Sequence, residues 1–143
     1  MKKNIIIIIC VVIIIALAVT VGALAKRQAD FAKRHEDTFR SCIEQTSYHL
    51  SQYIASGDEN EYREAVSEIY AAVAMSTFIG EESSEKDQLV NDLWIVYGYL
   101  TQQPDKSAPY LEELNTALSG YTDNGSKVVL EYKLRNFTHH VDE

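Results

Sequence analysis

The 143-residue sequence contains only two cysteines, and this scarcity excludes one class of small protein. Cys10 and Cys42 are 32 positions apart, so a continuous helix would separate them by about 48 Å. That distance is too long for a disulfide bond within one chain. A fold held together by internal disulfide bonds is therefore excluded, although Cys42 could still bridge two chains.

Basic residues are also few. The chain has 13 lysines and arginines against 21 acidic residues, and its formal net charge is −8. Nucleic-acid binding depends on lysine and arginine side chains that neutralise phosphate groups. We therefore expect no nucleic-acid partner, and the same reasoning argues against phosphate-rich substrates.

The sequence lacks the motifs of common catalytic and cofactor sites. It has no G-x-S-x-G elbow, no H-E-x-x-H pair, no phosphate-binding loop and no dinucleotide fingerprint. An EF-hand calcium loop with Gly125 at its sixth position would have Gly120 and Thr122 where acidic ligands are needed. We therefore expect a protein that is not an enzyme, with no cofactor and no catalytic or metal-binding residues.

One long apolar run is present, from Ile5 to Ala25, and it contains no charged residue. As a helix it would be about 31 Å long, which matches the hydrocarbon core of a bilayer. We predict that residues 1–25 are a single-pass membrane anchor that contacts lipid through residues 5–25. Ala23-Leu24-Ala25 also has the small-x-small pattern of a signal-peptidase site, so a cleaved signal peptide and a secreted protein remain an alternative.

The charges beside this run give conflicting signals about its orientation. Two lysines precede it, and five basic residues follow it: Lys26, Arg27, Lys33, Arg34 and Arg40. A count of positive residues would keep the C-terminal part in the cytoplasm. An N-terminal signal-like segment, however, usually sends the following domain across the membrane. We favour an extracytoplasmic domain at the cell membrane, and the Ile-rich start with Lys and Asn suggests a bacterial protein.

The remaining residues, 26–143, have apolar residues at helical spacings of three and four. The expected helices run from the membrane to Ser56, then over 58–79, 84–103 and 107–119. Gly57, Gly80 and Gly120 are the expected end signals, and Asp58, Ser84 and Ser107 are the expected starts. The apolar stripes are Phe39, Ile43, Thr46, Leu50 and Tyr53; Tyr62, Val66, Ile69, Val73 and Ser76; Leu89, Leu93, Val96 and Leu100; and Leu111, Leu114 and Leu118.

The last segment fits two patterns. Val128, Leu130, Tyr132 and Leu134 alternate as in a strand, whereas Leu130 and Leu134 also continue a helical stripe with Phe137 and Val141. A lone strand would have no partner, so we predict a helix after the turn at 123–126. The predicted fold is all-α: an N-terminal transmembrane helix that continues into an acidic, antiparallel bundle of four to five helices over residues 26–143.

A stripe of potential metal ligands lies on the first helix. His35, Cys42 and His49 are spaced by seven residues, so neighbours are about 10 Å apart along the axis, too far to share one zinc ion. We expect this face to flank the core, with metal binding or pH sensing as alternatives.

Tyrosine is unusually frequent, with nine residues in the chain. The sequence Tyr97-Gly98-Tyr99, close to Trp94, is the candidate interaction site. Tyrosine combines a rigid apolar body with a polar tip, and glycine within a helix can admit a close neighbour. The alternative is that these residues form the boundary layer of a thin bundle.

These observations favour a non-enzymatic, membrane-anchored interaction or accessory module at the bacterial cell envelope. Its partner would be another protein or a second copy of itself. A small-ligand sensor is an alternative, and it predicts an apolar pocket beside Tyr97 and Tyr99.

Overall fold

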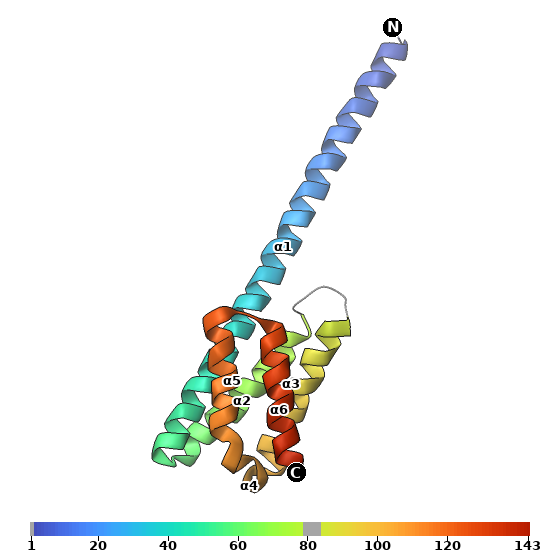
Figure 1. Cartoon of the computed structure of the whole chain (residues 1–143). Coiled ribbons are helices and arrows are strands. Elements are labelled where there is room, and N and C mark those ends of the chain that lie inside the picture. The colour runs from blue at the N-terminus through green and yellow to red at the C-terminus, as the bar shows by residue number, and fades with distance from the viewer. Residues whose placement is uncertain (1, 79–83) are drawn as a thin grey trace. The chain divides into compact units, whose positions relative to one another are not determined.

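The computed structural model describes residues 2–78 and 84–143. The predicted all-α fold is confirmed, and these residues form no strand. The elements are α1 (Lys2–Ser56), α2 (Glu59–Ser76), α3 (Ser84–Gln102), α4 (Pro104–Ser107), the 3₁₀ turn η1 (Ala108–Tyr110), α5 (Leu111–Asn124) and α6 (Lys127–Asp142). Figure 1 labels the six α-helices.

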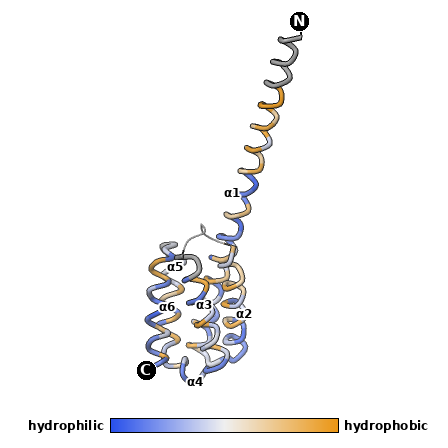
Figure 2. Tube along the Cα trace, turned by 90° about the vertical axis from the view of Figure 1, so that its right-hand side faces the viewer, coloured by the Kyte–Doolittle hydropathy of each residue, from blue (hydrophilic) through white to orange (hydrophobic). Residues whose placement is uncertain are grey.

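The chain divides into two compact units, Met1–Arg34 and His35–Glu143. The first unit is the N-terminal part of α1, where the side chains of residues 12–34 are all exposed. Its large apolar side chains between Val12 and Leu24 are 52–68% exposed. Figure 2 shows a hydrophobic stretch of α1 in this unit, followed by a hydrophilic one. The hydrophobic stretch is long and apolar enough to span a membrane, and none of it is buried within the protein.

The turn between α1 and α2 follows the predicted signals. Gly57 has a left-handed backbone, with φ of 70°, and its N–H donates to the carbonyl of Tyr53 at 2.7 Å. Asp58 then caps α2, because its Oδ1 accepts a hydrogen bond of 2.9 Å from the N–H of Asn60. Glycine tolerates this backbone and aspartate satisfies a free helical N–H, which explains why the chain turns here.

The predicted boundaries of the fourth helix are wrong. Ser107 ends the short α4, where its hydroxyl donates to the carbonyl of Pro104, and the long helix α5 begins only after η1. Gly120 lies inside α5, which ends at Gly125 with φ of 68°. Continuing past Gly120 buries Tyr121, which is only 2% exposed, and this burial outweighs the low helix propensity of glycine. The expected end signals at 79 and 80 lie outside the described residues.

Helix α6 confirms the choice of helix over strand. Its buried residues are Leu130, Leu134, Phe137 and Val141. Val128 and Tyr132, which a strand would place on the same face as Leu130 and Leu134, are 67% and 66% exposed. Ser126 caps this helix through a 3.4 Å hydrogen bond from the N–H of Val129.

In the second unit, one apolar core lies between α1, α2, α3, α5 and α6. Helix α3 packs against both α2 and α6, and α6 packs against α5. The predicted stripes supply most of this core, which includes Phe39, Ile43, Leu50, Ile69, Val73, Leu89, Leu93, Val96, Leu100, Leu111, Leu114, Leu118, Leu130, Leu134, Phe137 and Val141.

Side-chain hydrogen bonds join α1 to its neighbours. Ser47 donates to Oδ1 of Asn115 on α5 at 2.7 Å, and the amide nitrogen of Asn115 donates to Ser51 at 2.8 Å. On the other side of α1, Nδ1 of His49 lies 2.7 Å from Oε2 of Glu61 on α2. These pairs fix which helices flank α1.

Glu36 joins α1 to α5 and α6. Its Oε1 accepts a 3.2 Å hydrogen bond from the hydroxyl of Tyr121, and its Oε2 lies 2.6 Å from Nζ of Lys127. Burial, together with the carboxylate of Glu36, raises the pKa of Tyr121 above its usual value. The neutral phenol is therefore the form that this contact stabilises.

Candidate functional site

Three aromatic side chains, Tyr70 on α2 with Trp94 and Tyr97 on α3, form what we call the aromatic cluster. The ring centroids are 6.0 Å apart for Tyr70 and Trp94, 5.4 Å for Tyr70 and Tyr97, and 5.7 Å for Trp94 and Tyr97. These spacings are typical of favourable aromatic pairs. Tyr70 is 51% exposed and Trp94 is 47% exposed, so the cluster is held on two packed helices yet remains accessible.

The described helical neighbours of this cluster on α2 and α3 carry no charge. Helical neighbours lie three or four positions apart, and at those positions on the outer surface are Ser67, Ala74, Asn91, Gly98 and Thr101. All are exposed except Gly98, which is half-buried. The cluster therefore has uncharged residues one helical turn away on each helix, in an otherwise acidic domain.

The sequence-based candidate set is divided by the structure. Trp94 and Tyr97 belong to the aromatic cluster, but Tyr99 turns toward α6, where its hydroxyl donates to Asp142 and its ring meets the edge of Phe137 at 6.5 Å. The hydrogen bond to Asp142 raises the pKa of Tyr99 to about 12. Residues two positions apart are about 200° apart around a helix, which explains the division.

Among the described residues, none packs closely against Gly98. A Cβ atom built at this position would meet nothing within 4 Å. Tyr70, in contrast, was not singled out by sequence reasoning. It lies beside Ile69 of the second stripe. A large aromatic residue just outside the apolar face of a helix is the sequence signal that could have identified it.

The stripe His35, Cys42 and His49 faces α2 and the residues that follow it. The ring of His35 stacks on Phe78 with centroids 5.0 Å apart, and His49 pairs with Glu61. Burial, with a smaller effect of Glu68 on α2, raises the pKa of the Cys42 thiol. The three side chains therefore contact α2 and the residues that follow it, and the role of this face stays a prediction.

The described residues contain no group of three His, Cys, Asp or Glu side chains that could hold a metal ion. Each member of the His35, Cys42 and His49 stripe has its partner inside the protein.

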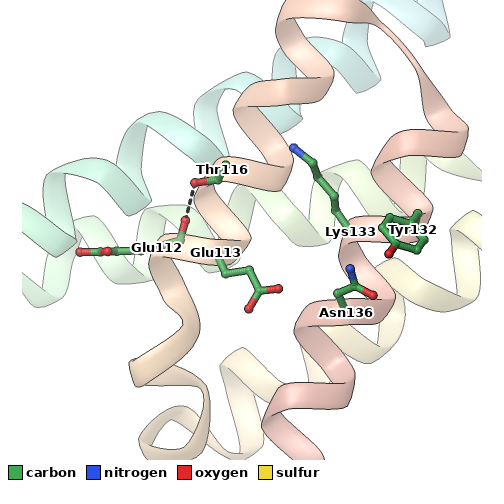
Figure 3. Close-up of a pocket in the computed structure, with 6 residues that line it drawn as sticks. All are labelled: Glu112, Glu113, Thr116, Tyr132, Lys133 and Asn136. Atoms are coloured by element: carbon green, nitrogen blue, oxygen red, sulfur yellow. Dashed lines mark hydrogen bonds between the residues drawn. The ribbon is translucent and has the colours of Figure 1, made fainter.

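A shallow groove of about 470 Å³ lies between α5 and α6 (Figure 3). It is lined by Glu112, Glu113, Thr116, Tyr132, Lys133 and Asn136. In Figure 3 the side chains of Glu113 and Asn136 point into the space between the helices, and Lys133 extends toward α5. A Cβ atom on Gly120 would lie 3.1 Å from Nζ of Lys133, so this glycine leaves room for the lysine.

The groove offers charges of both signs. Nδ1 of His140 lies 2.7 Å from Oε2 of Glu113 at one end, while Lys133 supplies an ammonium group on the opposite helix. Such a surface can bind a small polar molecule with both an anionic and a cationic group. It is a different place from the apolar pocket expected beside Tyr97 and Tyr99, because neither residue lines it.

Charge is distributed very unevenly between the two units. Residues 1–34 contain six basic residues and one acidic residue, whereas residues 35–143 contain seven basic and 20 acidic residues. The formal charges of the two units are therefore +5 and −13, which together give the −8 of the whole chain. The aromatic cluster and the α5–α6 groove both lie in the acidic unit.

Comparisons of the chain with known protein families, curated proteins and solved structures found no match.

Proposed function

We propose that the protein is a non-enzymatic, membrane-anchored module that binds another protein through the aromatic cluster of Tyr70, Trp94 and Tyr97. The observation that carries this proposal is the uncharged, partly exposed aromatic surface on a domain whose formal charge is −13. The cores of protein interfaces are depleted of charged residues, and their energetic centres are enriched in tryptophan and tyrosine.

Two further features support an aromatic docking surface. The three rings contact one another and lie on helices that pack together, so little side-chain freedom remains to be lost on binding. The acidic residues of the domain favour a partner whose rim is basic, because complementary charge accelerates encounter. The exposed apolar part of α1 supports anchoring, because it needs a lipid or protein environment to cover it.

Photo-crosslinking in cells tests this proposal. A photoreactive amino acid replaces Asn91, beside the aromatic cluster, and in a matched control it replaces the exposed Glu112 on α5. We expect a crosslinked product of defined mass from position 91 alone, which disappears when Trp94→Ser and Tyr70→Ser are added. A product of twice the chain mass would identify self-association. Identical products from both positions, or products insensitive to Trp94→Ser, would contradict the docking surface.

We also propose that the acidic domain is extracytoplasmic at a bacterial cell membrane. A cysteine added after Glu143, in a chain with Cys42→Ser, is exposed to a membrane-impermeant maleimide on intact cells. Labelling before lysis supports an extracytoplasmic domain, whereas labelling only after lysis means that the domain is cytoplasmic. The mass of the mature chain distinguishes an intact anchor from cleavage after Ala25, which would make the protein secreted.

The α5–α6 groove favours a second candidate function, the binding of a small zwitterionic molecule. Lys133 would bind its anionic group and Glu113 its cationic group. Thermal unfolding of the full chain in mild detergent is measured with amino acids and short peptides added, using Lys133→Gln as the control. A stabilising ligand whose effect is lost in the variant supports this function, and uniform absence of stabilisation counts against it.

A further inference from the structure

The segment of α1 that follows the apolar run, residues 26–34, has a surface chemistry unlike the rest of the chain. It contains four basic residues, Lys26, Arg27, Lys33 and Arg34, and one acidic residue, Asp30. Every side chain in it is exposed within the protein. We call it the basic segment, and its formal charge is +3, compared with −13 for residues 35–143.

The basic residues share one side of the helix. Lys26 and Lys33 are seven positions apart, as are Arg27 and Arg34, so each pair repeats on nearly the same face. The two pairs lie about 100° apart around the axis. The segment therefore has a basic face about 14 Å long, which begins directly after Ala25 and has Asp30 between the two basic pairs.

Part of this face forms a small groove of about 220 Å³, lined by Arg27, Asp30, Phe31 and Arg34. Guanidinium groups bind phosphate oxygens through paired hydrogen bonds, so two arginines in one groove suit a phosphate. Phe31, whose side chain is 57% exposed, adds an apolar surface beside them. Asp30 would repel a phosphate, but the two arginines leave the groove with a net positive charge.

We propose that the basic segment binds the headgroups of anionic phospholipids. This inference rests on the proposed membrane anchor, because a helix that spans the hydrocarbon core with residues 5–25 brings the next residues to headgroup depth. There the basic face meets phosphates directly, and each lysine or arginine strengthens the attraction to anionic lipid by roughly fivefold. The acidic domain gains nothing from such lipids, so the preference resides in residues 26–34.

Energy transfer from the full-length chain to labelled lipids tests this inference. The donor dye is attached at Gln28→Cys in a chain with Cys10→Ser and Cys42→Ser, reconstituted into phosphatidylcholine vesicles that contain phosphatidylglycerol. The acceptor is a trace of either lipid labelled on its acyl chain. We expect greater transfer to labelled phosphatidylglycerol than to labelled phosphatidylcholine. The excess should fall at least tenfold with Lys26→Gln plus Arg27→Gln, and also near 1 M salt, where the screening length is about 3 Å.

A matched control removes two positive charges from the acidic domain instead, with Arg63→Gln plus Lys106→Gln, and should leave the excess unchanged. Equal transfer to the two lipids, or an excess that both pairs of substitutions change alike, would overturn the inference. Flotation with pure phosphatidylcholine vesicles checks the anchor separately. Failure to float would refute the anchor, whereas flotation without any lipid preference would refute only the headgroup contact.

Discussion

Substitutions along α6 test the packing of this helix, because its buried and exposed residues alternate at helical spacing. Leu130 and Leu134 are fully buried, so replacing either with alanine should lower the free energy of unfolding by about 2–5 kcal/mol. Alanine has a slightly higher helix propensity than leucine, which offsets only a few tenths of this loss. Val128→Ala and Tyr132→Ala change side chains that are 67% and 66% exposed, and each should cost less than about 0.5 kcal/mol.

The assay is urea unfolding of the full-length chain in mild detergent, followed by tryptophan fluorescence. Trp94 is the only tryptophan and lies on α3, which packs directly against α6, so its emission reports unfolding of the helical domain. The urea midpoint should fall for Leu130→Ala and Leu134→Ala at an unchanged slope. Phe137→Ala is a positive control, since Phe137 is also fully buried.

The reasoning would be refuted if Val128→Ala and Tyr132→Ala destabilised the domain as much as Leu130→Ala and Leu134→Ala. Positions 128, 130, 132 and 134 would lie on the same face in a strand, where side chains repeat every two residues, but not in a helix. A helix places positions 128 and 132 in solvent and the other two in the core, so the pattern of losses separates the two structures.

Three further predictions use the same unfolding measurement or a simple labelling reaction. Gly57→Ala should lower the free energy of unfolding by about 1 kcal/mol, because Gly57 has a left-handed backbone. Gly120→Ala should raise the free energy of unfolding by about 0.5 kcal/mol, since only the mobile end of Lys133 must shift. The opposite order of stabilities would contradict the turn geometry. The pKa of Tyr121 is raised on folding, so the contribution of its phenol to stability is fully present below about pH 10 and is lost as the pH rises further. Above about pH 10 the Tyr121→Phe variant should therefore lose stability less steeply with pH than the unsubstituted protein. An unchanged slope would argue against a stabilising role of the neutral phenol. In a Cys10→Ser chain, Cys42 should react with maleimide at least tenfold more slowly in the folded protein than in the urea-unfolded protein, because burial raises the pKa of its thiol. Equal rates in the two states would mean that the thiol is accessible in the folded protein.

Much of the fold follows from the spacing of apolar residues. The stripe Phe39, Ile43 and Leu50 on α1 is fully buried, as are Leu130 and Leu134 on α6. A helix buries such a stripe by its own geometry, so the residues of the core could be recognised without knowing which helix lies beside which. The choice of helix for α6 needed one further argument, that a lone strand finds no partner.

The beginning and end of α5 could not be predicted in this way. Ser107 and Gly120 are local signals for a helix start and a helix end, but neither acts as one. Tertiary burial decides the outcome, because Tyr121 lies between Phe39, whose ring it meets at 5.6 Å, and the carboxylate of Glu36. Contacts with Phe39 and Glu36, which are far from Tyr121 in the sequence, thus favour continuation of α5 past Gly120.

The candidate interaction site was partly predictable for a related reason. Trp94 and Tyr97 lie one helical turn apart, so the sequence places them together, whereas Tyr97 and Tyr99 are only two positions apart in the sequence but point to different sides of α3. Tyr70 joins them only because α2 packs against α3, and that pairing is not written in either helix alone.

The distribution of charge bears on what the aromatic cluster binds. Exposed tryptophan and tyrosine side chains also suit the interface of a lipid bilayer. Lowering this cluster into an anionic bilayer would bring a domain of formal charge −13 against negatively charged headgroups, and like charges at that distance repel. The basic segment is attracted to the same headgroups. Opposite responses of the two units to one surface therefore favour a protein partner for the aromatic cluster and a lipid partner for residues 26–34.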